Sequence, residues 1–173
     1  MAKRIFASGN VTFTASAAGS QATGGGYMTV VGSAATQITD ILEVMISGKA
    51  TASTVAAMYL NRASTLGTGG AVALAGQNSD GAMNPATAAL ASPVVVAVDY
   101  TTNEAIPSST VTDGRLQLGL NLFGGIIRWN AAPTQQMTII SASAPGGSVI
   151  LWNSSSGGGS SGLADAHIIY ESF

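Results

Sequence analysis

Short apolar runs separated by turn residues recur along this chain from end to end, and this spacing limits the folds open to it. Segments such as "LQLGLNL" (116–122) and "DILEVMIS" (40–47) are followed within a few residues by Gly, Asn or Ser. No long segment has apolar residues at the three-and-four spacing of a helix with a capped start. The pattern predicts an all-β protein, either a sandwich or a barrel.

The alternation inside individual segments predicts which residues face the core. Side chains of a strand point to opposite faces in turn. In segment 116–122 every second residue is leucine, and the others are Gln, Gly and Asn, so the leucines predict one core face. In segment 40–47 the same rule puts Leu42, Val44 and Ile46 on one face and Ile41, Glu43 and Met45 on the other.

About eleven segments have a strand pattern, and we find no sign of a second domain. With 173 residues the chain is long enough for one domain with its own core. We predict an N-terminal arm at 1–9 and one β-sandwich domain over 10–173. The predicted strands are 10–16, 26–31, 40–47, 53–64, 70–76, 93–100, 116–122, 125–131, 136–142, 147–153 and 167–173.

Two segments without strand pattern are expected to be loops. The stretch "NSSSGGGSSG" (153–162) resembles a flexible linker, but it lies between the last two predicted strands. We therefore interpret it as a connection that lets the final strand return to the sheet. Segment 76–92 is predicted to be a long loop with a helical turn at 86–90, and loops of this kind often contact partners.

Charge is scarce in this chain, which bears on how it is kept in solution. Charged residues make up 8% of the sequence, against about 25% in a typical soluble domain. We infer that neighbouring subunits cover much of the surface, the alternative being a neutral, Ser/Thr-rich β-protein that is soluble alone. Six Lys and Arg residues are scattered rather than clustered, so we expect no nucleic-acid partner.

The sequence also indicates the cellular compartment in which the protein is made. The N-terminus has two cations but no sustained apolar run after them, so we predict no secretory signal peptide. The longest apolar runs, such as 93–98, are far too short to span a bilayer. We expect a soluble protein that is made in the cytoplasm and has no membrane partner.

Residues for catalysis or metal binding are sparse. There are no cysteines and one histidine, His167, which a catalytic triad would have to use with Asp165 or a more distant acid. Its position in a predicted strand favours a structural role instead. One His without Cys does not suit a zinc site, and the Gly-rich stretches lack a phosphate-loop ending. We predict no enzyme activity, no cofactor and no metal.

The two tryptophans are candidates for ligand or interface contacts. An exposed Trp can stack on a glycan or anchor an interface. Trp152 ends an apolar strand and is assigned to the core. Trp129 alternates with Ile127 but lies beside Arg128 and close to a Pro-containing turn, so core packing and exposure both stay open for it.

Four segments taken in order resemble small head proteins of tailed bacteriophages. They are "ITDILEVMISG" (38–48), "STVAAMYLNRASTLGTGG" (53–70), "LFGGIIRWNAAPTQQMTI" (122–139) and "HIIYESF" (167–173). The shared features are an I-x-E-hydrophobic strand, a strand ending in L-x-R-x-S-x-x-G-T, a Gly-Gly-hydrophobic-Arg-Trp-x-x-Pro segment and a terminal Y-E. Segments 76–92 and 153–162 lie outside this pattern.

The resemblance implies a jelly-roll or β-sandwich protein that decorates and stabilises the outside of an assembled head. Its partners would be the major capsid protein and copies of itself, most often as a trimer, and it would be located on the virion surface. We place the subunit contacts in the N-terminal arm, the 76–92 loop and the "RWNAAP" turn. The candidate interface residues are Arg4, Ile5, Phe6, Met83, Asn84, Pro85, Arg128 and Trp129.

Three other functions stay open. A receptor- or glycan-binding module, such as the tip of a tail fibre, would use the same fold class and its exposed aromatic residues. A major coat protein commonly carries a basic arm, and here only Lys3 and Arg4 are available. An enzyme on a jelly-roll scaffold ranks last because the candidate catalytic residues are so few.

Overall fold

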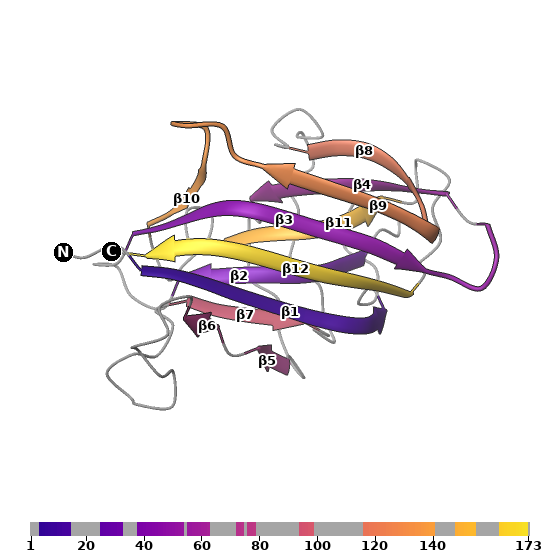
Figure 1. The fold of residues 1–173 in the computed structure, drawn as a ribbon, viewed down its shortest axis with the longest axis horizontal. Coiled ribbons are helices and arrows are strands. Elements are labelled where there is room, and N and C mark those ends of the chain that lie inside the picture. The colour runs from indigo at the N-terminus through magenta and orange to yellow at the C-terminus, as the bar shows by residue number, and fades with distance from the viewer. Residues whose placement is uncertain are drawn as a thin grey trace.

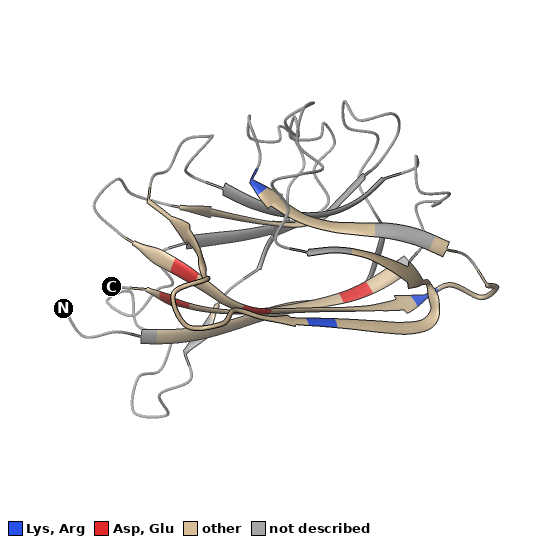
Figure 2. Cartoon of the chain, turned by 90° about the horizontal axis from the view of Figure 1, so that it is seen from above, with Lys and Arg blue, Asp and Glu red and all other residues tan. Residues whose placement is uncertain are grey.

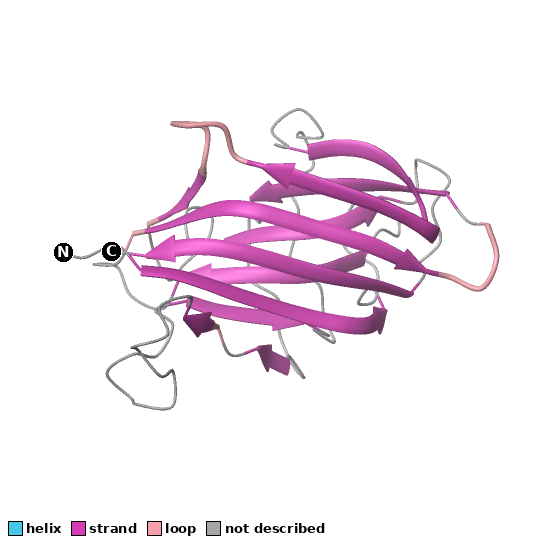
Figure 3. Cartoon of the chain, in the orientation of Figure 1, coloured by secondary structure: helices cyan, strands magenta, loops and turns pink. Residues whose placement is uncertain are grey.

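The computed structural model describes residues 4–14, 25–32, 38–53, 55–62, 72–74, 76–78, 94–98, 116–140, 148–154 and 163–172. This part of the chain contains strands and loops but no helix (Figure 3), which confirms the all-β prediction. The strands are β1 (Arg4–Thr14), β2 (Gly25–Gly32), β3 (Thr39–Lys49), β4 (Val55–Arg62), β5 (Val72–Leu74), β6 (Gln77–Asn78), β7 (Val94–Val98), β8 (Leu116–Asn121), β9 (Phe123–Asn130), β10 (Met137–Ile139), β11 (Ser148–Ser154) and β12 (Leu163–Ser172).

The strands form two six-stranded antiparallel sheets (Figure 1). The first, sheet A, has the order β10-β3-β12-β1-β6, with β9 also paired to β3; the second, sheet B, has the order β5-β7-β2-β11-β4-β8. Seen from above, the sheets lie as two layers, one over the other (Figure 2). Arg4 pairs with Ser172, so the two ends of the described chain lie side by side in sheet A.

Eight strands pair in a nested pattern. β1 pairs with β12, β2 with β11, β3 with β9 and β4 with β8. The pairs alternate between the sheets, and β12–β3 and β11–β4 contacts join them within each sheet. The early half of the chain therefore lies against the late half. The Gly/Ser tract after β11 connects sheet B to sheet A, but residues 155–162 themselves lie outside the described part.

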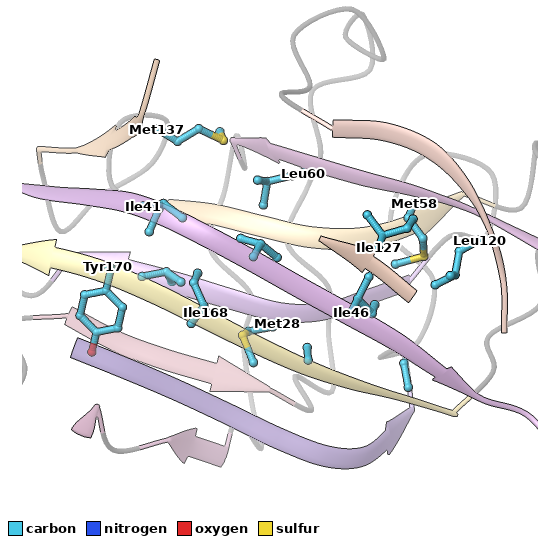
Figure 4. Close-up of a cluster of buried hydrophobic side chains, with 14 of the residues drawn as sticks. Met28, Ile41, Ile46, Met58, Leu60, Leu120, Ile127, Met137, Ile168 and Tyr170 are labelled. Atoms are coloured by element: carbon cyan, nitrogen blue, oxygen red, sulfur yellow. The ribbon is translucent and has the colours of Figure 1, made fainter. Parts of the chain in front are cut away.

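Apolar side chains from both sheets form one core (Figure 4). Sheet B contributes Met28, Val30, Met58, Leu60 and Leu120, and sheet A contributes buried side chains from all five of its longer strands. Burying one large apolar side chain contributes about 1.5–3 kcal/mol. The core therefore holds the two layers together.

The predicted faces of β3 are wrong in one respect. Ile41, Val44 and Ile46 are buried, whereas Leu42 is only half-buried. The register with β12 shifts at this point, where Ile169 pairs with Glu43 but Tyr170 pairs with Ile41. This β-bulge adds one residue, and an added residue reverses the alternation of faces on one side of it.

The predicted leucine face of segment 116–122 is also only partly correct. Leu120 and Leu122 are buried, but the Leu118 side chain is 52% exposed, and that of Leu116 is outside the description. β8 is the end strand of sheet B, so its side chains have a neighbouring strand on one side only. Leu122 is buried in the turn between β8 and β9 rather than in a strand.

Candidate functional site

The structure places residues 4–9 of the predicted N-terminal arm inside the fold, and residues 1–3 lie outside the described residues. Residues 4–9 belong to β1, which lies between β12 and β6 in sheet A. Phe6 is only 1% exposed and stacks on Tyr170, with ring centroids 5.5 Å apart. The interface assignment of Phe6 is therefore wrong, because its ring packs in the core.

The remaining candidates near the N-terminus and in the long loop have different outcomes. Ile5, adjacent to Phe6, points to the outside of sheet A and is 43% exposed. Arg4 lies on β1, but its side chain is outside the description. Met83, Asn84 and Pro85, like the helical turn predicted at 86–90, lie outside the described residues.

Arg128 and Trp129 point to opposite faces of β9. Trp129 is half-buried and packs against the core. Arg128 is exposed and binds the Glu43 carboxylate twice: Nε donates to Oε1 at 3.0 Å and Nη2 donates to Oε2 at 2.8 Å. The hydrogen bonds that Arg128 donates to Glu43, and then the negative charge of Glu43, raise the pKa of Arg128, so this guanidinium remains charged.

Most charged side chains of the described chain lie in sheet A, on the face that points away from the core. We call this set the charged face; Figure 2 shows it on the layer that contains β3, β9 and β12. Lys49 lies 3.6 Å from Asp165, and Thr138 donates a hydrogen bond to Asp40. The charged face consists of Asp40, Glu43, Lys49, Arg128, Asp165 and Glu171.

His167 lies in the middle of the charged face. The register places it in one row with Gly9 of β1, Met45 of β3 and Arg128 of β9. A Cβ atom on Gly9 would lie 3.0 Å from His167 Cδ2, so the ring occupies the space that the glycine leaves. His167 is thus one half-buried member of a sheet face, as its strand position predicts.

Within the described residues, no three His, Cys, Asp or Glu side chains are grouped so that they could hold a metal ion. In the same part of the chain, no helix is long and apolar enough to cross a membrane.

A second surface feature is the side of the molecule where β8 and β9 lie. These two strands are joined by a short turn and each ends a sheet. Four of the large apolar residues that are exposed in the described chain lie on or beside them: Val55, Leu118, Phe123 and Ile126. We call this set the apolar edge.

Sequence reasoning missed the apolar edge because it assigned every leucine of β8 to the core. The signal that was available is the Gly-Gly pair at 124–125. A glycine pair inside a strand pattern indicates a bulge, and bulges are frequent at the edges of sheets. The Glu43–Arg128 pair was also missed, since the two residues are 85 positions apart.

No family model, curated protein or solved structure matches this chain.

Proposed function

We propose that this chain is a structural protein of a bacteriophage head, a jelly-roll decoration protein that binds the outside of the assembled shell and stabilises it. It would act as a symmetric oligomer, with the major capsid protein as its other partner and the virion surface as its location. The role needs no catalytic group, cofactor or metal. The resemblance of four sequence segments to small phage head proteins motivates this proposal.

The observation that carries the proposal is the nested strand pairing. A jelly roll has eight strands in two sheets, in which the first strand pairs with the last, the second with the seventh, and so on inward. The pairs β1–β12, β2–β11, β3–β9 and β4–β8 have this order. Viral capsid proteins and lectins are among the proteins built on jelly rolls, so the order favours a capsid or binding role.

The surface supports a role in an assembly. The apolar edge exposes large side chains, and the chain has few charges with which to keep a free monomer soluble. Exposed apolar patches commonly mark interaction sites. Contacts with copies and with the shell would cover such surface.

The receptor- or glycan-binding alternative depended largely on Trp129 as an exposed stacking residue. Its indole is half-buried against the core, so only part of the ring is available to a sugar. We therefore prefer the capsid role.

The proposed mechanism is mass action. A protein that binds assembled shells but not free capsid subunits stabilises the shell by RT ln(1 + [L]/Kd) per site. Many copies on one shell add these small contributions, and simultaneous contacts raise the overall affinity.

The test is to add the purified chain to assembled heads that lack it and to measure co-sedimentation and the temperature at which the shell dissociates. We expect binding and a dissociation temperature that rises with the concentration of the chain. Unassembled capsid subunits are the control and should not bind. Absence of both co-sedimentation and a temperature shift would overturn the proposal, and binding to a glycan panel instead would favour the alternative.

A further inference from the structure

β9 presents an open hydrogen-bonding edge. In the described chain it pairs with β3 and with no other strand. The Ala131 N–H donates to the Leu42 carbonyl oxygen at 2.8 Å, so the backbone groups of Ala131 point toward β3. Backbone groups alternate sides along an antiparallel strand. Those of Ile126, Arg128 and Asn130 therefore point away from β3.

The side chains of this edge do not protect it. Edge strands of monomeric proteins are commonly guarded by lysine, proline, an inward-pointing charge or a bulge. Between positions 126 and 130 there is no lysine or proline. The one charged side chain, Arg128, donates two hydrogen bonds to the Glu43 carboxylate, whose negative charge balances it. Ile126 is 67% exposed, the most of any large apolar side chain in the described chain.

The open edge begins at Ile126 and ends at Asn130. Before Ile126, the register with β3 shifts between Phe123 and Ile126, and Gly124 has a φ of +76°. After Asn130 the chain turns, and Thr134 has a φ of +65°. The edge that a partner strand can follow is thus a short window, from Ile126 to Asn130.

We propose that β9 pairs antiparallel with β9 of a second copy of this chain, about a two-fold axis. A partner here must bring a strand with its own free backbone groups, and each copy supplies one. The Glu43–Arg128 pair removes net charge from the edge, so two identical edges do not repel each other. A two-fold axis also makes every contact twice. The proposal deepens the proposed function by naming the contact between copies.

The charges select a register. Backbone groups that face the edge must meet their counterparts, so even-numbered residues pair with even-numbered residues. An axis at Arg128 would place two guanidinium groups directly opposite each other, and this local contact is unfavourable although each edge carries no net charge, because the Glu43 carboxylates lie behind it on β3. An axis at Ile126 would draw the Gly124 bulge into the pairing. An axis at Ile127 pairs Ile126 with Arg128 of the partner subunit and packs Ile126 on the aliphatic stem of that arginine. The pairing ends there, because Asn130 would next meet Gly124 of the partner subunit, which lies outside the open edge.

The test is the mass of the full chain in solution, measured by sedimentation equilibrium. We expect the unmodified chain to have the mass of a dimer and Ile126→Lys to have that of a monomer. Ile140→Lys is the matched control, because Ile140 is 57% exposed and lies after β10, outside the apolar edge. It should remain a dimer.

Ile126→Pro gives a second variant. It removes an N–H that points to the open edge, where it would pair with Arg128 of the partner subunit, and it leaves the bonds to β3 in place, so it too should be a monomer. Circular dichroism verifies that each variant is folded. An unmodified chain that is monomeric or trimeric, or an Ile126→Lys variant that remains dimeric while folded, would overturn the proposal.

Head binding separates this proposal from the capsid role. Monomeric Ile126→Lys that still co-sediments with heads, even weakly, would leave both proposals standing. A dimeric chain that binds no heads would overturn the capsid role alone. A monomeric unmodified chain whose head binding is lost with Ile126→Lys would overturn the pairing of copies and assign the edge to the shell.

Discussion

The backbone of Leu122 lies directly against Gly48, so closely that a Cβ atom on Gly48 would be 2.2 Å from both Cα and the carbonyl oxygen of Leu122. Next to this contact, the Ala50 N–H donates to the Leu122 carbonyl oxygen at 2.8 Å. Leu122 itself is fully buried. The turn that takes the chain from sheet B to sheet A is therefore fixed against the end of β3.

We predict that Gly48→Ala lowers the free energy of unfolding by about 3 kcal/mol, the upper end for overpacking. The added methyl group meets backbone, which cannot rotate away as a side chain can. Gly119→Ala is the matched control, because no atom lies within 4 Å of a Cβ placed there. Urea unfolding of both variants measures the difference, and equal stability would contradict the close contact.

Phe6→Ala tests the placement of β1 in the core. The ring is buried and stacks on Tyr170, so we expect a loss of about 3–5 kcal/mol in the free energy of unfolding. Ile5→Ala, on the adjacent exposed residue, should change it by less than about 1 kcal/mol. Similar losses of unfolding free energy in the two variants would mean that Ile5 and Phe6 do not point to opposite faces of sheet A. Deletion of residues 1–9 should likewise unfold the protein rather than leave a folded domain.

A pair of buried serines should respond in opposite ways to alanine. In the described chain Ser8 Oγ has no hydrogen-bond partner, so Ser8→Ala should be neutral or stabilise by up to about 1 kcal/mol. Ser172 Oγ lies 2.9 Å from Thr39 Oγ1 and donates to the Ile38 carbonyl oxygen at 3.2 Å. Ser172→Ala should destabilise by about 1–2 kcal/mol. Thermal unfolding distinguishes the signs, and a clear loss in Ser8→Ala would contradict its unpartnered state.

The bulge in β3 predicts unequal effects at two neighbouring residues. Ile41→Ala removes a fully buried side chain and should cost about 2–5 kcal/mol. Leu42→Ala, on the half-buried face, should cost about 1 kcal/mol or less. Strict alternation through Leu42, Val44 and Ile46 would give the reverse order, so unfolding free energies of the two variants decide between the registers.

Stability should not depend on the titration of Arg128 near neutral pH. Glu43 raises the pKa of this guanidinium. A group with a raised folded-state pKa contributes stability that is complete below its unfolded-state pKa and is lost only as the pH rises through the folded-state value. Both pKa values of Arg128, folded and unfolded, lie far into the alkaline range. Adding salt at pH 7 should weaken the coupling between Arg128 and Glu43, as a double-mutant cycle would measure.

Local patterns were sufficient to predict the class of fold and most strands. The strands β7 and β4 lie within the predicted segments 93–100 and 53–64, which were recognised from apolar content and flanking turn residues, because these signals lie within a few residues. The two-residue strand β6 was missed, since Gln77 and Asn78 carry no strand pattern and pair only through contact with β1.

Features that depend on distant contacts could not be predicted in this way. The bulge that turns Leu42 out of the core is visible only in the register with β12. The exposure of Leu118 follows from the place of β8 at the end of a sheet, which its own alternation does not encode. Of the candidate interface residues, Ile5 and Arg128 are exposed whereas Phe6 is buried. Ile5 and Phe6 differ because successive side chains of β1 point to opposite faces of the sheet.

If this chain is a component of a phage shell, as we propose, its copy number in purified particles will show it. Quantitative mass spectrometry would compare this chain with the major capsid protein in virions of the phage that encodes it. We expect a ratio of one copy per capsid subunit or a simple fraction of that. A few copies per particle would place the chain at a vertex or tail, and absence from the particle would overturn the proposed role in the shell.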